Sequence, residues 1–350
     1  MMKILHAADL HLDTAFTGRP ESQVSYLKKA LLSLPETIAQ LCTAHQCDLL
    51  LLSGDLFDGP ATRESIDALK NALSSLSIPV CIAPGNHDFC SPDSPYLTEI
   101  WPENVHIFTR PAMECLSLPA LNCRIYGAGF TGMDCDPLLE HFRAGDADSW
   151  HIGILHGDPL QKNSPYCPIS QAQVAGSGLH YLALGHIHKA GQFAAGSTLC
   201  AWPGCPMGRG NDETGEKGVY LVTLDKSVSL EFLPLNTPRF YDLEAEVLTT
   251  AEETIRALLP AVGNRNFYRI TLIGECEPSP APTFPDFPHL ELRDRTVPPA
   301  PLWDSCGQDS LEGIYFQLLH DALASEDQET VMLAAKISRR ILDGREVILP

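Results

Sequence analysis

The sequence predicts a layered α/β fold, and two observations carry that prediction. From Met1 to about Leu235, short apolar runs of strand character alternate with segments whose apolar residues recur at helical spacing. The chain has 350 residues, of which 44% are hydrophobic, so it can bury a large core and still form a smaller second region. Alternation of this kind is typical of sheets covered by helices.

The expected elements follow one another in a regular order along this first region. We expect a closing hairpin at its end, so the main domain should cover residues 1–237. In chain order, the predicted elements are a strand at Ile4–Ala8, a helix near Tyr26–His45, a strand at Leu49–Ser53, a helix near Thr62–Leu76, strands at Pro79–Ala83, Arg124–Tyr126, His151–Leu155 and Tyr181–Leu184, and a hairpin of Gly218–Leu224 and Val228–Leu233.

Three further regions follow the main domain. Residues 238–277 read as a strand, a helix and a strand, which predicts a small α+β capping region. Residues 278–304 hold eight prolines, and so much proline favours an extended linker. Residues 305–350 carry apolar stripes at helical spacing, and Asp327 and Gly344 mark the start and end of a second helix there. Such stripes must be covered, either by the main domain or by a partner.

Composition excludes several classes of protein. The formal charge is −20, which opposes indiscriminate binding along a polyanion. No apolar run approaches the length of about eighteen residues that a membrane span needs, so we expect a cytoplasmic protein that does not bind membranes. The twelve cysteines are scattered and form no CxxC pair, which indicates reduced thiols.

Five apolar runs end in residues that can bind a metal, namely ILHAADLH, LLLLSGD, VCIAPGNH, HIGILH and YLALGHIH. One such residue alone is usually structural, but five in succession at the ends of strands predict a ligand site. Gly54, Gly85 and Gly185 precede three of these residues, where a sharp turn would aim the next side chain at the site. The predicted ligands are Asp9, His11, Asp55, Asn86, His156, His186 and His188.

This ligand set indicates the kind of metal. It mixes nitrogen and oxygen donors without a thiolate, which suits catalytic manganese, iron or zinc better than a structural zinc site. Seven ligands are too many for one tetrahedral ion. The set therefore indicates more than one ion.

The motifs DLHLD, GDLFD, GNHD, LHG and GHIH resemble, in the same order, those of the calcineurin-like metallophosphoesterase superfamily. This resemblance implies a layered sandwich of mixed β-sheets flanked by helices, and a metal-dependent hydrolase. The opening ADLHLD and the segment PGCPMGRGNDETGEKGVYLV make the chain similar to SbcD-type DNA repair exonuclease subunits, in particular their bacterial YhaO-like branch. That likeness implies a phosphodiesterase that acts as a DNA exonuclease or endonuclease.

The resemblance also assigns roles to single residues. It implies that Asp9, His11 and His188 hold one ion. Asn86, His156 and His186 would hold the other, and Asp55 would bridge both. Manganese is the implied ion, with iron, zinc and magnesium as alternatives.

Two further residues take catalytic roles by the same resemblance. His87 would contact the scissile phosphate and help the leaving oxygen depart. Asp58 would fix the tautomer of that imidazole and favour its charged form, although Asp88 could compete for this role.

The implied partners are DNA and an SbcC-like coiled-coil ATPase bound by residues 305–350, and a homodimer is left open. Two alternatives remain: a small-molecule phosphodiesterase or phosphatase of the same superfamily, and a scaffold protein acting through its C-terminal helices. We interpret Gly127–Gly132, which fits a dinucleotide-binding pattern, as a loop because a poor helix start follows it. Arg209 lies in the loop after GHIH, where it could meet a phosphate, but because it stands among glycines we interpret it as a solvated side chain.

Overall fold

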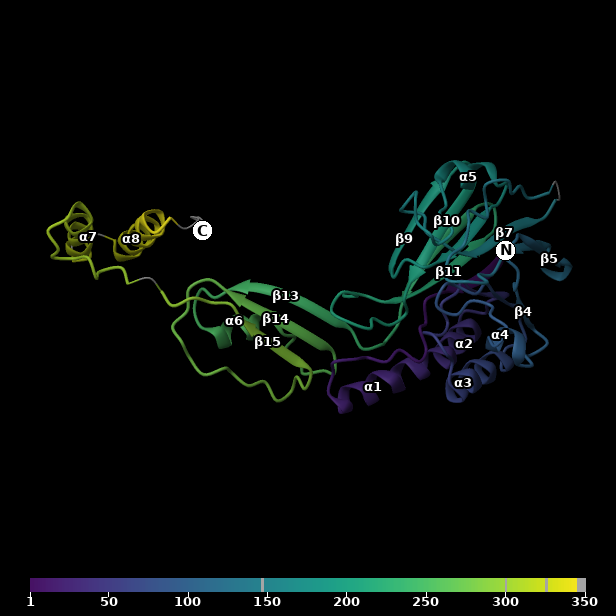
Figure 1. Ribbon diagram of the computed structural model, residues 1–350, viewed down its shortest axis with the longest axis horizontal. Coiled ribbons are helices and arrows are strands. Elements are labelled where there is room, and N and C mark those ends of the chain that lie inside the picture. Colours follow the sequence, from purple (N-terminus) through teal and green to yellow (C-terminus); the bar gives the residue numbers. More distant parts are fainter. Residues whose placement is uncertain (146–147, 300, 325–326, 345–350) are drawn as a thin grey trace. The chain divides into compact units, whose positions relative to one another are not determined.

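The structure is a computed structural model that describes residues 1–145, 148–299, 301–324 and 327–344. The chain divides into two compact units (Figure 1). The first comprises Met1–Asp242 together with Arg265–Tyr268, and the second comprises the rest. The first unit therefore reaches beyond the predicted boundary at residue 237. Phe240 and Phe267 explain this, because their rings stack 4.6 Å apart and both belong to the apolar core of the first unit.

Two six-stranded sheets form the framework of the first unit, as predicted for an α/β layered fold. In the first sheet the pairs β1/β2, β2/β3 and β3/β4 are parallel, and β11 pairs antiparallel with β1 and with β12. Both sheets are thus mixed, since the second also contains parallel and antiparallel pairs. The first sheet runs in the order β12 (Val228–Pro234), β11 (Gly218–Leu224), β1 (Met2–Ala7), β2 (Leu49–Leu52), β3 (Val80–Ile82) and β4 (Val105–Ile107).

The second sheet keeps the strands that carry the later motifs side by side. The pairs β6/β7, β7/β8 and β8/β10 are parallel, so their carboxyl ends point the same way. The order is β5 (Glu114–Leu118), β6 (Cys123–Gly127), β7 (Trp150–His156), β8 (Tyr181–Gly185), β10 (Thr198–Gly204) and β9 (Lys189–Ala195).

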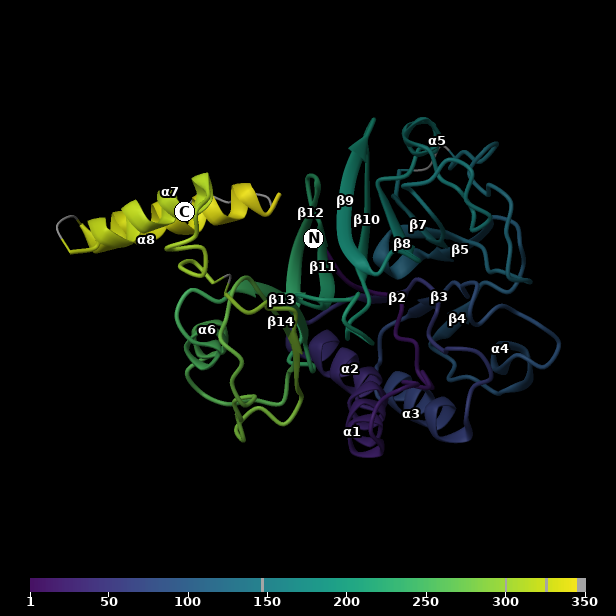
Figure 2. The ribbon, with the colours of Figure 1, turned by 60° about the vertical axis from the view of Figure 1, so that its left-hand side comes forward.

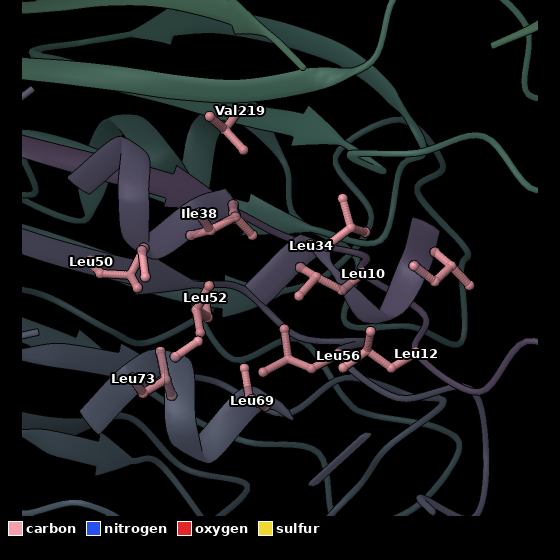
Figure 3. Close-up of a cluster of buried hydrophobic side chains, with 14 of the residues drawn as sticks. Leu10, Leu12, Leu34, Ile38, Leu50, Leu52, Leu56, Leu69, Leu73 and Val219 are labelled. Carbon is pink, nitrogen blue, oxygen red and sulfur yellow. The ribbon is translucent and has the colours of Figure 1, made fainter. Parts of the chain in front are cut away.

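Three helices cover the outer face of the first sheet: α1 (Glu21–Leu32), α2 (Leu34–Ala44) and α3 (Arg63–Ser74), as Figure 2 shows. Leu50 and Leu52 of β2 point to this side, where they meet Ile38 of α2 and Leu69 of α3 (Figure 3). The predicted single helix near Tyr26–His45 is two helices. The reason is Pro35, which has no backbone N–H and is tolerated only in a first helical turn, where it stands in α2.

The alternate residues of the same strands fill the space between the two sheets. Ile4 and Leu51 from the first sheet share a buried cluster with Ile152 and Ile154 of β7 and Ala183 of β8. Because successive strand side chains point to opposite faces, each central strand is apolar on both sides. The first unit is completed by α5 (Gln171–Gly176), which packs on the outer face of the second sheet, and by the short α4 (Pro95–Thr98) and η1 (Pro119–Leu121).

The C-terminal part of the chain contains a three-stranded sheet and two helices. The strands of the sheet are ordered β13 (Phe240–Glu246), β14 (Phe267–Ile273) and β15 (Leu290–Asp294). The helix α6 (Ala251–Leu258) follows β13 and precedes β14 along the chain. The strand β15 lies inside the region 278–304 that we expected to be a linker. Residues 289–297 hold no proline there, and the half-buried Leu290 and Leu292 alternate with exposed residues as in an edge strand.

The terminal helices are α7 (Leu311–Ala322) and α8 (Gln328–Leu342), within the predicted region 305–350. Residues 325–326 and 345–350 of that region lie outside the described residues. Asp327 accepts a hydrogen bond from the Thr330 backbone N–H and caps α8, as its position in the sequence predicts. Across the described parts of the chain, every helix is too short or too polar to cross a membrane.

Candidate metal centre

The predicted ligands lie at the carboxyl ends of five strands, where the two sheets meet. Asp9 and His11 follow β1, Asp55 follows β2, and Asn86 follows β3. His156 ends β7, while His186 and His188 follow β8. The His186 backbone N–H donates to Asp9 Oδ1 over 2.9 Å, which ties the second sheet to the first at this edge. The structure thus brings all seven residues to one place.

The backbone at these strand ends is strained. Asp9, His11, Asp55 and His186 all have positive φ angles, between 47° and 95°. Such angles are uncommon for residues other than glycine and are maintained only where surrounding contacts fix them. Hydrogen bonds do this here, because the backbone N–H groups of Asp9 and His11 donate to the carbonyl oxygens of Gly54 (3.0 Å) and Asp55 (2.9 Å).

Two of the glycines before the ligands allow close approach. A methyl group at Gly85 would lie 2.2 Å from Asp55 Oδ1, and one at Gly185 would lie 1.9 Å from the Ser53 carbonyl oxygen. Both distances are far inside van der Waals contact. Any side chain at these positions would therefore displace a site residue or the strand beside it.

Asp9, His11 and His188 form one group whose donor atoms lie close together. His11 Nε2 and His188 Nε2 are 3.1 Å apart. His188 Nδ1 lies 2.7 Å from the carboxylate of Glu213, an acceptor, and 3.0 Å from Nη2 of Arg209, a donor. The shorter contact, to the carboxylate, favours a proton on Nδ1, and Nε2 faces the group. The buried Asp9 Oδ2 also has no hydrogen-bond partner. A cation would satisfy these atoms.

Asn86, His156 and His186 form a second group around the Asn86 Oδ1 atom. This oxygen lies 3.0 Å from His156 Nε2 and 3.2 Å from His186 Nδ1. His156 Nδ1 is 2.9 Å from the Ser53 carbonyl oxygen and must donate to it, so in the neutral ring Nε2 carries a lone pair that faces another acceptor. Such a contact requires a positive charge, from a proton or a metal ion.

Asp55 reaches both groups. Its Oδ2 atom lies 3.3 Å from His156 Nε2 and 3.8 Å from His11 Nε2, and the carboxylate is almost completely buried. Burial alone lowers the pKa of His156, but Asp55 and Asp9 overcome it and raise that pKa to about 9. Burial opposes the charge on Asp55, yet the surrounding imidazoles hold its pKa below the usual range. The site therefore favours extra positive charge. The residues fit two divalent ions.

His87 lies beside the ligands with its side chain 42% exposed. Its Nδ1 atom is 2.9 Å from Asp58 Oδ1, and the hydrogen bond to Asp58 raises the pKa of His87. The imidazoles of His11 and His87 in turn hold the pKa of Asp58 well below its usual range. Because Nδ1 faces Asp58, Nε2 is the ring nitrogen left for a substrate.

Asp88 does not compete for His87. Its buried carboxylate accepts the backbone N–H groups of Gly85 (2.8 Å) and Leu56 (2.7 Å) and the hydroxyl of Tyr96. Asp88 thus joins the loop after β2 to the loop after β3. Its role in the structure is to hold the two loops that present Asp55 and Asn86.

Sequence reasoning missed Glu213 and discounted Arg209, and both belong to the site. The Arg209 side chain is only 19% exposed, and its guanidinium lies 2.7 Å from Glu213 and 3.8 Å from Asp58. The expectation of a solvated arginine is therefore wrong. Glu213 holds both Arg209 and His188, and despite burial these two partners keep the pKa of its carboxyl below the usual range. Both residues stand in the family-like segment PGCPMGRGNDETGEKG, a signal that could have drawn attention to them.

Comparisons with known proteins agree on the family. The profile described as calcineurin-like phosphoesterase matches residues 2–190. The chain is 33% identical over 247 residues to the "uncharacterized metallophosphoesterase YhaO" of Bacillus subtilis (strain 168), covering 66% of this chain and 60% of that one. It is 26% identical to the SbcD component of the nuclease SbcCD from the same organism, covering 63% of this chain and 66% of that one.

A third relative extends the range of these similarities. The chain is 24% identical to the "DNA double-strand break repair protein Mre11" of Aeropyrum pernix, covering 58% of this chain and 53% of that one. The similar region spans less than two thirds of the length of each of these three relatives.

Proposed function

This chain belongs to the calcineurin-like phosphoesterase family, and from that premise we propose that it is a two-metal phosphodiesterase whose substrate is DNA. The observation that carries the proposal is the position of Asp55. Its carboxylate lies within 3.8 Å of imidazole nitrogens from both ligand groups. A carboxylate so placed suits two ions that share one ligand.

Different residues of the chain would take different roles in the hydrolysis of a phosphodiester. Two divalent ions held by the seven ligands would supply Lewis acidity and an acidified water. The attacking water would lose a proton to solvent as its oxygen forms a bond to phosphorus, and the phosphorus bond to the leaving oxygen would break. His87, charged and held by Asp58, presents Nε2 to that oxygen and gives it a proton. Arg209 lies 3.8 Å from Asp58 and adds positive charge on the same side.

The choice of DNA rests on the relatives. One is named as part of a nuclease and another as a DNA double-strand break repair protein, and their similarity to this chain is 26% and 24%. We infer the same substrate class here, together with a partner ATPase of the SbcC type. The exposed apolar residues of α7 and α8, including Leu311 and Leu318, support a partner on those helices.

A small-molecule phosphodiesterase is the second candidate, and the charge of the chain favours it. A net charge of −20 repels a long polyanion wherever bound cations do not compensate it. A short diester carries a single negative charge and meets much less repulsion. The same metal centre would serve either substrate.

One experiment separates the two candidates. The purified protein is incubated with manganese and single-stranded or double-stranded linear DNA, beside bis(p-nitrophenyl) phosphate. DNA cleavage at a kcat/KM at least as high as that of the chromogen supports the nuclease. Cleavage of the chromogen with intact DNA supports the small-molecule enzyme. If neither is cleaved in the presence of manganese, iron, zinc or magnesium, the proposed activity is wrong.

A further inference from the structure

A cavity of about 390 Å³ is lined by His87 and by residues that the chemistry above does not use. We propose that this cavity binds the nucleoside that departs with the leaving oxygen. The inference rests on the proposed function, because it names which part of a phosphodiester the site would hold. It concerns only residues of the first unit.

His87 joins the cavity to the metal centre. Its ring packs edge-on against the ring of His11, with centroids 4.9 Å apart, and it also lines the cavity. The imidazole that would protonate the leaving oxygen is therefore part of the cavity wall. A group attached to that oxygen would enter next to this wall, whereas no contact with His87 places the other substituent of the phosphate there.

The walls of the cavity suit a flat, uncharged group. Phe57 and Ile66 border the cavity from the buried core, and the half-buried Phe89 and Pro95 give it apolar surface that a ligand can reach. An aromatic side chain such as Phe89 can stack with a nucleobase, and such a contact contributes about 1–3 kcal/mol to binding. The volume lies within the range of about 300–1,000 Å³ that is usual for small-molecule sites.

The charges around the cavity argue against a second phosphate. No lysine or arginine is among the described residues that line it, while two aspartates are. Asp88 is buried and fully engaged with backbone N–H groups, so the exposed Asp93 is the carboxylate that a ligand can meet. A carboxylate there accepts hydrogen bonds from the ring N–H or amino groups of a base and repels an anion. These features favour a base and its sugar over the charged backbone.

Thr98 offers a way to fill the cavity without disturbing the core. It lies at the exposed end of α4 and lines the cavity, so the larger side chain of Thr98→Trp can occupy the space. Leu97 precedes it on the same helix, is 51% exposed and does not line the cavity. Leu97→Trp is therefore a matched control that adds the same side chain to the same short helix.

The decisive experiment compares Thr98→Trp with the wild-type protein on substrates that lack one base. The substrates are the dinucleoside monophosphate TpT and two analogues, each lacking one thymine, and the products show which nucleoside departs without the phosphate. In the wild-type protein, removing the departing thymine should lower kcat/KM by about 10-fold to 100-fold. In Thr98→Trp, TpT and that analogue should be cleaved with the same kcat/KM, while Leu97→Trp should behave like the wild type.

Two results would overturn the inference while the phosphodiesterase assignment survives. One is an unchanged effect of base removal in Thr98→Trp. The other is a Thr98→Trp variant in which base removal loses its effect for the nucleoside that keeps the phosphate, and not for the one that departs.

Binding of thymidine to the metal-free protein, measured by saturation-transfer NMR, keeps the test independent of catalysis. If Thr98→Trp abolishes thymidine binding and Leu97→Trp retains it, the cavity site is supported even when no diester is cleaved. Absence of diester cleavage would contradict only the proposed function. Absence of thymidine binding to the wild-type protein overturns the inference.

Discussion

The metal centre and the terminal helix pair use opposite kinds of residue in opposite places. In the centre, charged and polar side chains are buried, with Asp9 and Asp55 each 1% exposed and His156 fully covered. In α7 and α8, large apolar side chains are exposed, with Leu311 at 87% and Leu318 at 65%. Each pattern has a cost, since buried charges need compensation and exposed apolar surface favours association.

The difference shows where each region finds its partners. The site residues are held by other residues of the same unit, so the arrangement is complete apart from the cations it favours. The helix pair buries little: Phe316 of α7 and Val331 and Ala335 of α8 are covered. Apolar side chains such as Met332 and Ile337 are only half-buried, and a hydrogen bond between Tyr315 and Ser338 adds a polar link. We infer that the first region acts on its own and the second through another protein.

The largest effect is expected for Asp55→Asn in the metal centre. Because this carboxylate reaches both ligand groups, its loss weakens both ion sites together, and activity on every substrate should disappear. Metal content and turnover of a chromogenic diester are the measurements. Asp67→Asn is the control, since Asp67 pairs with Arg63 on the exposed surface of α3. Near-normal turnover with two bound ions would contradict a bridging role for Asp55.

Much of this centre could be predicted from the sequence, because the position of each ligand next to an apolar run is a local feature of the chain. All seven predicted ligands meet, since each stands at the carboxyl end of an apolar strand and the parallel strands of each sheet end at one edge. That the edges of the two sheets face each other is a feature of the folded chain. Arg209 and Glu213 could not be found in this way. They come from a loop after β10, and only the folded chain shows that Glu213 pairs with His188.

The same contrast applies to the fold. The buried strands β1, β2, β7 and β8 were predicted because they are apolar on both faces. The edge strand β9 was missed, since its sequence KAGQFAA is mostly exposed and has Phe193 as its one large apolar residue. Strand β15 was hidden by the prolines around it. The buried strand β10 was missed as well, because the proline and glycine in TLCAWPG weaken its strand pattern, whereas the edge strand β12 was predicted.

His87→Ala should give the next largest effect. The ring lies beside the ligands without a ligand position, so metal binding should persist while kcat falls by roughly 10²–10⁴-fold, the usual range for a lost general acid. The loss should be greater for an alkoxide leaving group than for p-nitrophenolate, which departs without a proton. His141→Ala, at an exposed position, is the control. Loss of metal in His87→Ala would instead make this residue a ligand.

Glu213→Gln tests whether the support of His188 matters for the ion. The carboxylate is the acceptor 2.7 Å from His188 Nδ1 and favours a proton there, whereas an amide can present either a donor or an acceptor. Removing such a partner typically costs about 10–100-fold in metal affinity. Calorimetric titration with manganese should show that loss at one of two sites. Glu216→Gln is the matched control, since Glu216 is exposed and pairs with Arg239. Equal affinities in both variants would restrict Glu213 to a structural role.

The smallest effect on catalysis is expected from changes in the terminal helices, and this sharpens the contrast between the two regions. Deleting residues 305–350 should leave manganese-dependent cleavage of a small diester unchanged, because every predicted ligand and His87 lie in the first unit. The truncated protein should fail to co-purify with an SbcC-like ATPase from the same genome. Loss of folding in the truncated chain would show that these helices serve the rest of the protein.

The full-length chain offers a finer version of this test. Ile314 and Leu318 of α7 are 56% and 65% exposed, so replacing both with serine should spare folding, because neither side chain packs in a core. If these side chains meet the coiled coil of a partner, the double variant should lose the ATPase while it retains diester cleavage and thermal stability. Leu160→Ser, at a position 64% exposed in the first unit, is the matched control and should retain the ATPase. Retention of the ATPase by the double variant would place the binding surface elsewhere and leave the exposed stripe of α7 without a role in that complex.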